Sequence, residues 1–199
     1  VYKRQYERCE KIMNTENIKA FAEKHSELLK DVRQSLIVIV TAVIFAVILG
    51  KYVFLNANIP SASMENTIMT GDKLIANRLY YNKHDPARGD IVIFNAPDTG
   101  EEYIKRVIGL PGEKVKIKDC KLYVDGKCLK EPYLKDEKWT NDNGPYTFNV
   151  PKGSYLLLGD NRNNSFDARE WKHTYVKRDA IKAKAGLRYY PFDRFGVVQ

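Results

Sequence analysis

Two serines and one lysine are the residues of this sequence whose types best fit nucleophilic chemistry. Ser61 and Ser63 lie in the segment IPSASM at 59–64, and Lys105 lies in YIKR at 103–106. A serine hydroxyl is a weak nucleophile until a base removes its proton, and a neutral lysine amine can be that base. Apolar neighbours on a predicted strand would lower the pKa of Lys105 by desolvation. The two segments therefore predict a serine nucleophile with a lysine base, a pair able to cleave acyl bonds.

A histidine base is the alternative that the residues leave open. His84 and His173 lie in polar, turn-like stretches, and His25 precedes a long apolar segment. A Ser-His-Asp triad would need one of these three side chains. Replacing each with alanine tests this alternative, because full activity in all three variants excludes a histidine base.

An apolar segment at 36–55 precedes the serines. It reads LIVIVTAVIFAVILGKYVFL, which is about the 20 residues needed to cross a hydrocarbon core of roughly 30 Å. Lys51 is its one charged residue and lies near the end, where it can reach the headgroups beside Tyr52. A cleaved secretory signal is the alternative, but 35 mostly polar residues precede this segment. The segment predicts a retained transmembrane helix.

Positive charges near this segment predict its orientation. Lys24, Lys30 and Arg33 lie close before it, whereas Lys51 alone follows it closely. Lysine and arginine are in excess on the cytoplasmic side of membrane spans. We therefore expect the N-terminal residues in the cytoplasm and the long C-terminal part outside.

The chain after the apolar segment predicts one β domain. About 145 residues follow, enough for one compact core. Short β-branched and aromatic runs between Pro, Gly, Asn and Asp clusters are typical of antiparallel strands. We expect a cytoplasmic segment at 1–35, helical from about 15, a transmembrane helix at 36–55 and a mostly β domain at 56–199. The expected strands lie within 73–81, 90–96, 102–109, 113–118, 121–127, 146–150, 154–159 and 181–190.

Charge and cysteine content narrow the choice of partners. A formal net charge of +8 would draw the β domain to anionic lipid. The lysines are scattered without a helix-turn-helix, zinc or RNA-binding motif, so we expect no nucleic-acid binding, and no ligand spacing predicts a metal. Cys120 and Cys128 flank the turn signal Asp125-Gly126. A disulfide between them could form in an oxidising exterior. Two free thiols are the other alternative, because a two-residue turn would place Tyr123, and not Cys120, opposite Cys128.

Four ordered blocks give the chain a resemblance to a known family. They are IPSASMENTI at 59–68, RGDIVIF at 88–94, YIKRVIGLPG at 103–112 and GDNRNNSFDAR at 159–169. In order and spacing, these blocks resemble those of the bacterial type I signal peptidases, or leader peptidases. The resemblance runs from the apolar segment to the last residues.

The resemblance implies both fold and function. It implies a transmembrane helix followed by a large, mostly β catalytic domain of the type shared by signal peptidases and self-cleaving repressors. The expected activity is removal of signal peptides from exported preproteins, after small A-x-A residues, at the outer face of the cytoplasmic membrane. Preprotein signal peptides and the lipid bilayer are the expected partners, a secretion translocon stays open as a third, and no cofactor is expected.

The resemblance also assigns roles to residues. Ser63 would attack, Lys105 would be the general base, and the Ser61 hydroxyl with the Ser63 N–H would form the oxyanion hole. Ser165 would orient Lys105. A scaffold of charge pairs behind the site would comprise Asp160, Arg162, Asp167 and Arg169. Shallow apolar pockets for the substrate would be lined by Ile59, Met64, Ile68, Tyr103 and Ile104.

Three positions depart from the family's usual pattern. Asn66 stands where proline is common, Asn163 where aspartate is common and Ala168 where serine is usual. None of the three replaces a reacting group, so the departures concern the loop after Ser63 and the charge network.

Two other classes of function stay as alternatives. A self-cleaving repressor would share the Ser-Lys β domain, but it would lack a membrane span and carry a DNA-binding module. A membrane-anchored β domain without enzymatic activity would not take a covalent label on Ser63.

Overall fold

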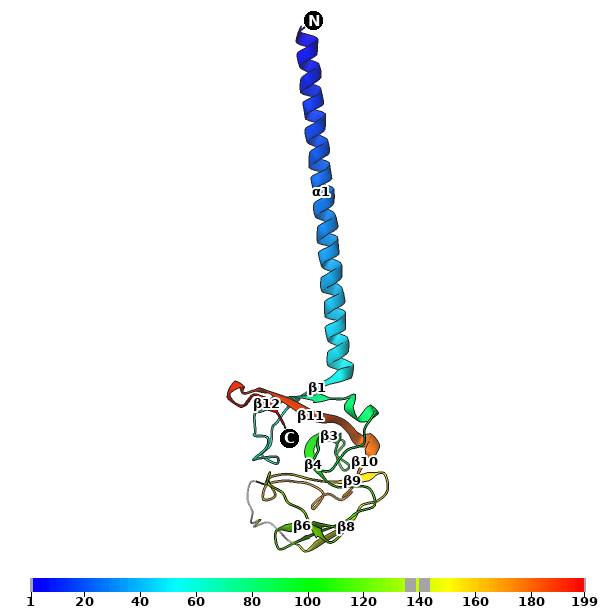
Figure 1. Cartoon of the computed structure of the whole chain (residues 1–199), viewed down its shortest axis with the longest axis vertical. Coiled ribbons are helices and arrows are strands. Elements are labelled where there is room, and N and C mark those ends of the chain that lie inside the picture. The colour runs from blue at the N-terminus through cyan, green and yellow to red at the C-terminus, as the bar shows by residue number, and fades with distance from the viewer. Residues whose placement is uncertain (1, 135–138, 140–143, 199) are drawn as a thin grey trace. The chain divides into compact units, whose positions relative to one another are not determined.

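The structure is a computed structural model that describes residues 2–134, 139 and 144–198, and side chains from residue 13 except 16, 18 and 20–23. The chain divides into two compact units, Val1–Leu49 and Gly50–Gln199. The first unit is helical and the second is mostly β, as the sequence predicts (Figure 1).

The first unit is one long helix. α1 covers Tyr2–Ile48, and a π-helical turn, η1, follows at Leu49–Val53. Helical residues Lys24–Val53 are long and apolar enough to cross a membrane. Their large apolar side chains are exposed rather than packed in a protein core. A strand begins at Phe54, so the last two residues of the expected 36–55 helix instead begin a β-sheet.

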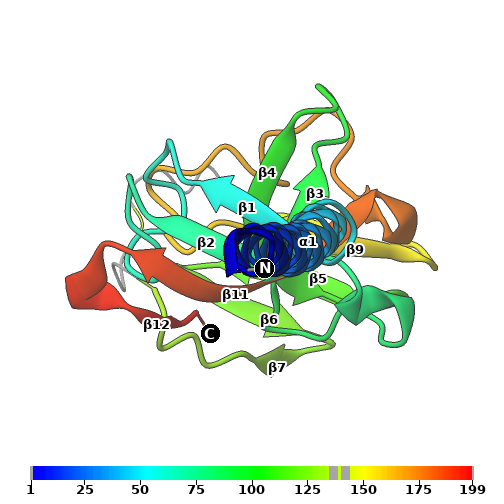
Figure 2. The same cartoon turned by 90° about the horizontal axis from the view of Figure 1, so that it is seen from above.

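The larger sheet carries most of the second unit. Its strands run in the order β1-β2-β11-β3-β4-β9-β10, and β12 pairs with β11. Figure 2 shows β2 between β1 and β11. Every strand pairing is antiparallel, as hairpin-rich sequences favour. The strand bounds are β1 Phe54–Asn58, β2 Lys73–Asn77, β3 Ile91–Asn95, β4 Glu102–Gly109, β9 Ser154–Leu158, β10 Val176–Lys177, β11 Ile181–Tyr190 and β12 Gly196–Val197.

The strand expected at 73–81 is shorter than predicted. It ends at Asn77, whose side-chain oxygen accepts hydrogen bonds from the N–H groups of Leu79 and Tyr80 at 2.9 and 3.1 Å. An asparagine side chain that bonds nearby backbone in this way favours a turn over a strand. A short 3-10 helix, η2, therefore follows at Tyr80–Asn82.

The smaller sheet has the order β7-β6-β5-β8. Its strands are β5 Lys114–Lys118, β6 Lys121–Val124, β7 Lys127–Cys128 and β8 Tyr146–Asn149. Asp125 and Gly126 make the tight turn with positive φ angles of 47° and 81°. Tyr123 lies opposite Cys128, and Cys120 and Cys128 are free thiols in this structure.

The two sheets share one apolar core. Val107 and Leu157 of the larger sheet and Val115 and Leu122 of the smaller sheet belong to the same buried cluster. A separate cluster around Met64 and Ile68 lies beneath the loop between β1 and β2. These two clusters hold the strands and the loop that carry the candidate catalytic residues.

Candidate active site

Lys105 and Ser63 come from different elements that the sheet brings together. Lys105 lies on β4, where β3 places Val92 opposite it. Ser63 lies in the loop between β1 and β2, whose ends are joined by the Ile59 N–H to Asp72 O bond of 3.0 Å and the Gly71 N–H to Ile59 O bond of 2.8 Å. The loop is therefore closed at its base and presents Ser63 to the strand.

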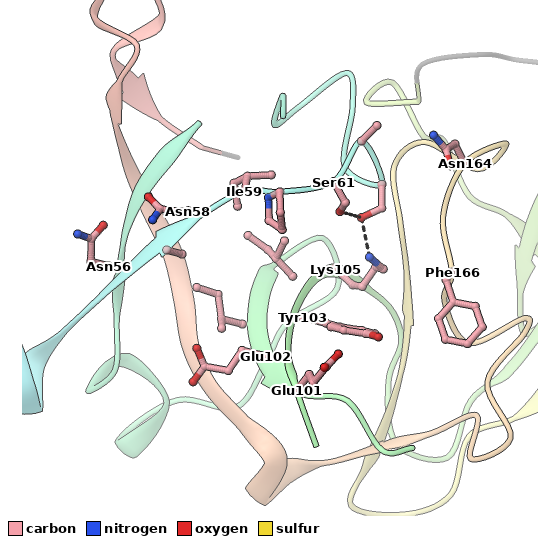
Figure 3. A pocket seen from close by; sticks show the side chains of 16 residues that line it. Asn56, Asn58, Ile59, Ser61, Glu101, Glu102, Tyr103, Lys105, Asn164 and Phe166 are labelled. Carbon is pink, nitrogen blue, oxygen red and sulfur yellow. Dashed lines mark hydrogen bonds between the residues drawn. The ribbon is translucent and has the colours of Figure 1, made fainter. Parts of the chain in front are cut away.

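The lysine amine and the serine hydroxyl are in direct contact. Lys105 Nζ donates a hydrogen bond to Ser63 Oγ over 2.7 Å, and both residues are buried, at 4% and 6% exposure (Figure 3). Burial lowers the pKa of Lys105 to about 8, against the opposing attraction of Asp167 and Asp160. A substantial fraction of the amine can thus be neutral at mildly alkaline pH.

Ser61 lies beside Ser63. Its Oγ is 3.4 Å from Ser63 Oγ, and the side chain lines a cleft that opens beside Ser63 and Lys105 (Figure 3). A hydroxyl at this place can donate a hydrogen bond to a negative oxygen that forms next to Ser63.

A cleft of about 600 Å³ opens beside the two serines and the lysine. Of the residues predicted to contact substrate, Ile59, Tyr103 and Ile104 line it. Met64 and Ile68 do not, because both have 0% exposure and pack in the core beneath the loop. The apolar residues of this block alternate between cleft and core, a distinction that residue type alone does not reveal. Further lining residues are Ala57, Ala62, Ile93, Asn164 and Phe166.

One side of β4 is open along the cleft. β9 pairs with β4 at Arg106, Val107 and Gly109, whereas β3 pairs with it from Glu102. Residues 102–105 therefore have β3 as their one strand partner among the described strands. An open strand edge can bind an extended peptide through backbone hydrogen bonds.

The two histidines of the second unit interact with residues other than Ser63 and Lys105. His84 Nδ1 lies 2.9 Å from the Tyr80 carbonyl oxygen, and its ring stacks on Tyr80 at 4.6 Å between centroids. His173 Nδ1 lies 2.7 Å from Asp98 Oδ1. Neither lines the cleft that holds Ser63 and Lys105, and His25 lies in α1.

Comparison with known proteins identifies the family. The model of the family described as signal peptidase, peptidase S26, matches residues 32–190. The chain belongs to the signal peptidase family. Membership makes it a peptidase, a hydrolase whose substrates are preproteins with signal peptides.

Relatives in the signal peptidase family cover most of the chain. A probable signal peptidase I-2 of Synechocystis is 40% identical over 165 residues, which are 80% of this chain and 73% of the relative. Signal peptidase IB of Staphylococcus aureus is 35% identical over 182 residues, which are 83% of this chain and 93% of the relative. A crystal structure of a signal peptidase I from Enterococcus faecalis covers 51% of this chain and 97% of its own, with 36% sequence identity and a TM-score of 0.45.

In this signal peptidase, buried ion pairs lie behind the lysine. Asp167 pairs with Arg169 at 2.9 Å, and although burial raises the pKa of Asp167, the Arg169 contacts and backbone N–H groups hold it below the ordinary value. Asp160 pairs with Arg106 through two bonds of 2.8 and 2.7 Å. Arg162 pairs with Glu131. The sequence predicted four of these residues, Asp160, Arg162, Asp167 and Arg169. It did not predict Glu131 or Arg106, which directly follows the lysine.

The backbone around Gly159 lies against Ser63. A Cβ at Gly159 would lie 2.5 Å from the Ser63 carbonyl oxygen and 2.2 Å from Ser165 Oγ. Ser165 Oγ is buried without a hydrogen-bond partner in the described structure, so its expected bond to Lys105 is not formed there. Asn161, also missed in the sequence, donates from its backbone N–H to Ser63 O and from Nδ2 to Ala62 O, both at 3.1 Å. Asn161 lies inside the GDNRNNSFDAR block, and this position could have indicated a role near the site.

Within the described part of the chain, no group of three or more His, Cys, Asp and Glu side chains is arranged to hold a metal ion.

Proposed function

We propose that this signal peptidase is a membrane-anchored serine endopeptidase in which Ser63 is the nucleophile and Lys105 the general base. The hydrogen bond of 2.7 Å between Lys105 Nζ and Ser63 Oγ, in a buried site that opens to a cleft, carries the proposal. A base must lie within hydrogen-bond reach of the proton that it removes, and this pair meets the requirement.

The reaction has two stages. In the first, neutral Lys105 takes the Ser63 proton as Oγ attacks the carbonyl carbon before the cleavage site, and the ammonium then protonates the leaving amine. An acyl-enzyme forms as the peptide bond breaks. In the second, Lys105 takes a proton from water, the hydroxide attacks the ester, and Ser63 recovers its proton. The Ser61 hydroxyl and the Ser63 N–H would stabilise each oxyanion, a contribution of roughly 3 to 4 kcal/mol per donor in comparable sites.

Selectivity for small residues follows from the cleft. Ile59, Ile93 and Ile104 line the cleft beside the lysine. Branched side chains at these positions would exclude bulky substrate residues by overlap and so favour A-x-A sequences. The open edge of β4 at 102–105 would align the extended substrate by strand addition.

Anchoring rests on the apolar helix. Helical residues Lys24–Val53 have the length and composition of a span, and their large apolar side chains would otherwise face water. We place residues 1–35 in the cytoplasm, the helical residues from 36 to 53 across the membrane and the β unit from Phe54 onward outside, as the basic residues before the span favour. The bilayer is then a constant partner, and a translocon is a candidate partner of the cytoplasmic helix.

One assay tests the proposal. Cleavage of a preprotein with an A-x-A site is measured in lipid vesicles for the intact chain, Ser63→Ala and Lys105→Ala, with folding checked by circular dichroism. We expect both variants to fold and to lose activity. Activity surviving in either variant would refute the Ser-Lys pair and direct attention to His84 and His173, which alanine replacement would then test.

A further inference from the structure

The segment that leads out of the smaller sheet lies against the ion pairs behind the lysine. We call residues 131–134, which come shortly after β7, the bracing segment. Its Glu131 carboxylate pairs with Arg162, with Nη2 2.5 Å from Oε1, and the two side chains are 5% and 1% exposed. Tyr133 Oη donates to the same Glu131 oxygen over 2.7 Å. Buried charges of this kind persist where they are paired and hydrogen-bonded.

The same segment also contacts the second arginine. The Arg106 guanidinium carbon lies 4.0 Å from the centre of the Tyr133 ring, in cation–π geometry. Arg106 in turn holds Asp160 through two hydrogen bonds. Burial raises the pKa of Tyr133 above its ordinary value, so the phenol keeps the proton that it donates to Glu131.

From the two arginines the contacts continue to the nucleophile. Arg162 Nε donates to the Gly159 carbonyl oxygen over 2.9 Å, and Asp160 is the next residue. The Gly159 backbone leaves no room for a Cβ against the Ser63 carbonyl and Ser165. Glu131 and Tyr133 thus reach Ser63 through two arginines and one short stretch of backbone.

We propose that Glu131 and Tyr133 are positioning residues for the Ser63–Lys105 pair, so that the smaller sheet supports catalysis through the bracing segment. The proposal rests on the proposed function, because it concerns the geometry of that pair. Neither residue lines the cleft, so their effect should fall on kcat and leave KM unchanged. Displacements of about 1 Å can cost on the order of a hundredfold in rate.

The charges around this region explain why Glu131 matters. Three cations, Arg106, Arg162 and Arg169, lie behind the lysine, facing the carboxylates of Asp160, Asp167 and Glu131. Glu131→Gln keeps the shape but leaves Arg162 without its carboxylate. The guanidinium must then seek another partner, which loosens its bond to the Gly159 carbonyl.

The test is a double-mutant cycle on the full chain in lipid vesicles, with an A-x-A preprotein. We expect Glu131→Gln and Arg162→Lys each to lower kcat roughly tenfold to a hundredfold at unchanged KM. If Glu131 acts through Arg162, the double variant is no slower than the slower single variant. Tyr133→Phe removes one hydrogen bond while keeping the ring, and we expect a smaller fall in kcat.

Leu129→Ala is the matched control. Leu129 lies two residues before the bracing segment and packs on the core, so its loss should lower the unfolding temperature without the kcat effect. The proposal is overturned if folded Glu131→Gln keeps the kcat of the parent chain, if the two losses multiply, or if Leu129→Ala lowers kcat equally. Tyr133→Phe decides the matter where Glu131→Gln does not fold, and unchanged kcat there refutes it. Activity of Ser63→Ala in the same assay would instead refute the proposed function.

Discussion

Lys105 Nζ donates to Ser63 Oγ over 2.7 Å from the stretch of β4 that precedes the start of β9 pairing at Arg106. The base and the open strand edge are therefore the same few residues. A peptide that adds to residues 102–105 would bring its backbone carbonyl next to the hydroxyl that Lys105 activates. Under the proposed function, one strand would both align the substrate and carry the base that activates Ser63.

The pH dependence of cleavage should follow the loss of a proton from Lys105. With the pKa of Lys105 lowered to about 8, the neutral base is the minor form below that pH and the major form above it. We expect kcat/KM to rise about tenfold per pH unit below pH 7 and to level off above pH 9. Initial rates between pH 5 and 10 measure this. A rate that stays level from pH 5 to 10, with the fold intact throughout, would exclude a lysine base of this kind.

The lowered pKa of Lys105 should also reduce the free energy of unfolding at low pH. Folding lowers the lysine pKa from 10.5 to about 8, so the folded state disfavours the charged amine. The cost is complete below pH 8 and disappears as pH rises through 10.5. We expect Lys105→Met to raise the free energy of unfolding by about 2 to 3 kcal/mol at pH 6, less at pH 10.

Denaturant unfolding in detergent at pH 6, 8 and 10 measures this difference. Lys114→Met is the control, because Lys114 is exposed on β5 and its replacement should give a small, pH-independent change. A stabilisation by Lys105→Met that is equal at pH 6 and pH 10 would show that the lysine is not desolvated.

Gly159 should tolerate no side chain. A methyl group there would lie 2.5 Å from the Ser63 carbonyl and 2.2 Å from Ser165 Oγ, so backbone must shift. We expect Gly159→Ala to lower kcat about a hundredfold, since the shift moves the nucleophile. Gly196→Ala is the control, because its Cβ would meet nothing within 4 Å. Parental activity in Gly159→Ala would mean that the contact with Ser63 is not needed for catalysis.

The sequence predicted that Ser63 and Lys105 act as a pair, and the structure brings the two side chains into contact. Ser63 and Lys105 are recognisable by residue type within two blocks, and the mostly β unit follows from short runs between turn residues. The partners of Arg162 and Asp160 were not predictable in this way, since Glu131 and Arg106 approach them only through the tertiary fold. Charge alone does not predict which carboxylate pairs with which arginine.

Hydropathy also misplaced one boundary. Phe54 and Leu55 continue an apolar run, so the sequence assigned them to the membrane helix, whereas the structure places them in β1. Leu55 is buried in the sheet, where an apolar residue gains as much as in lipid. Met64 was misassigned for a similar reason, because an apolar residue beside Ser63 can face either the cleft or the core.

Asn161 should hold the loop of the nucleophile. Its Nδ2 donates to the Ala62 carbonyl at 3.1 Å, so Asn161→Asp places a carboxylate oxygen against that carbonyl. We expect kcat to fall about tenfold or more and KM to change little. Asn149→Asp, an exposed change on β8, serves as the control in the same kinetic assay. If folded Asn161→Asp matches the parent chain in kcat, the side-chain bond does not position Ser63.

Ile104 should set the size limit for substrate residues before the cleavage site. It lines the cleft next to Lys105, so Ile104→Ala enlarges the space available to a substrate side chain. Two substrates are compared: one with an A-x-A site, and one in which valine replaces one of its alanines. We expect the kcat/KM of the valine substrate, divided by that of the A-x-A substrate, to rise roughly tenfold in the variant. Competition between the two preproteins measures this ratio directly. Met64→Leu should leave it unchanged, because Met64 packs in the core. An unchanged ratio in Ile104→Ala would place the size-limiting wall elsewhere in the cleft.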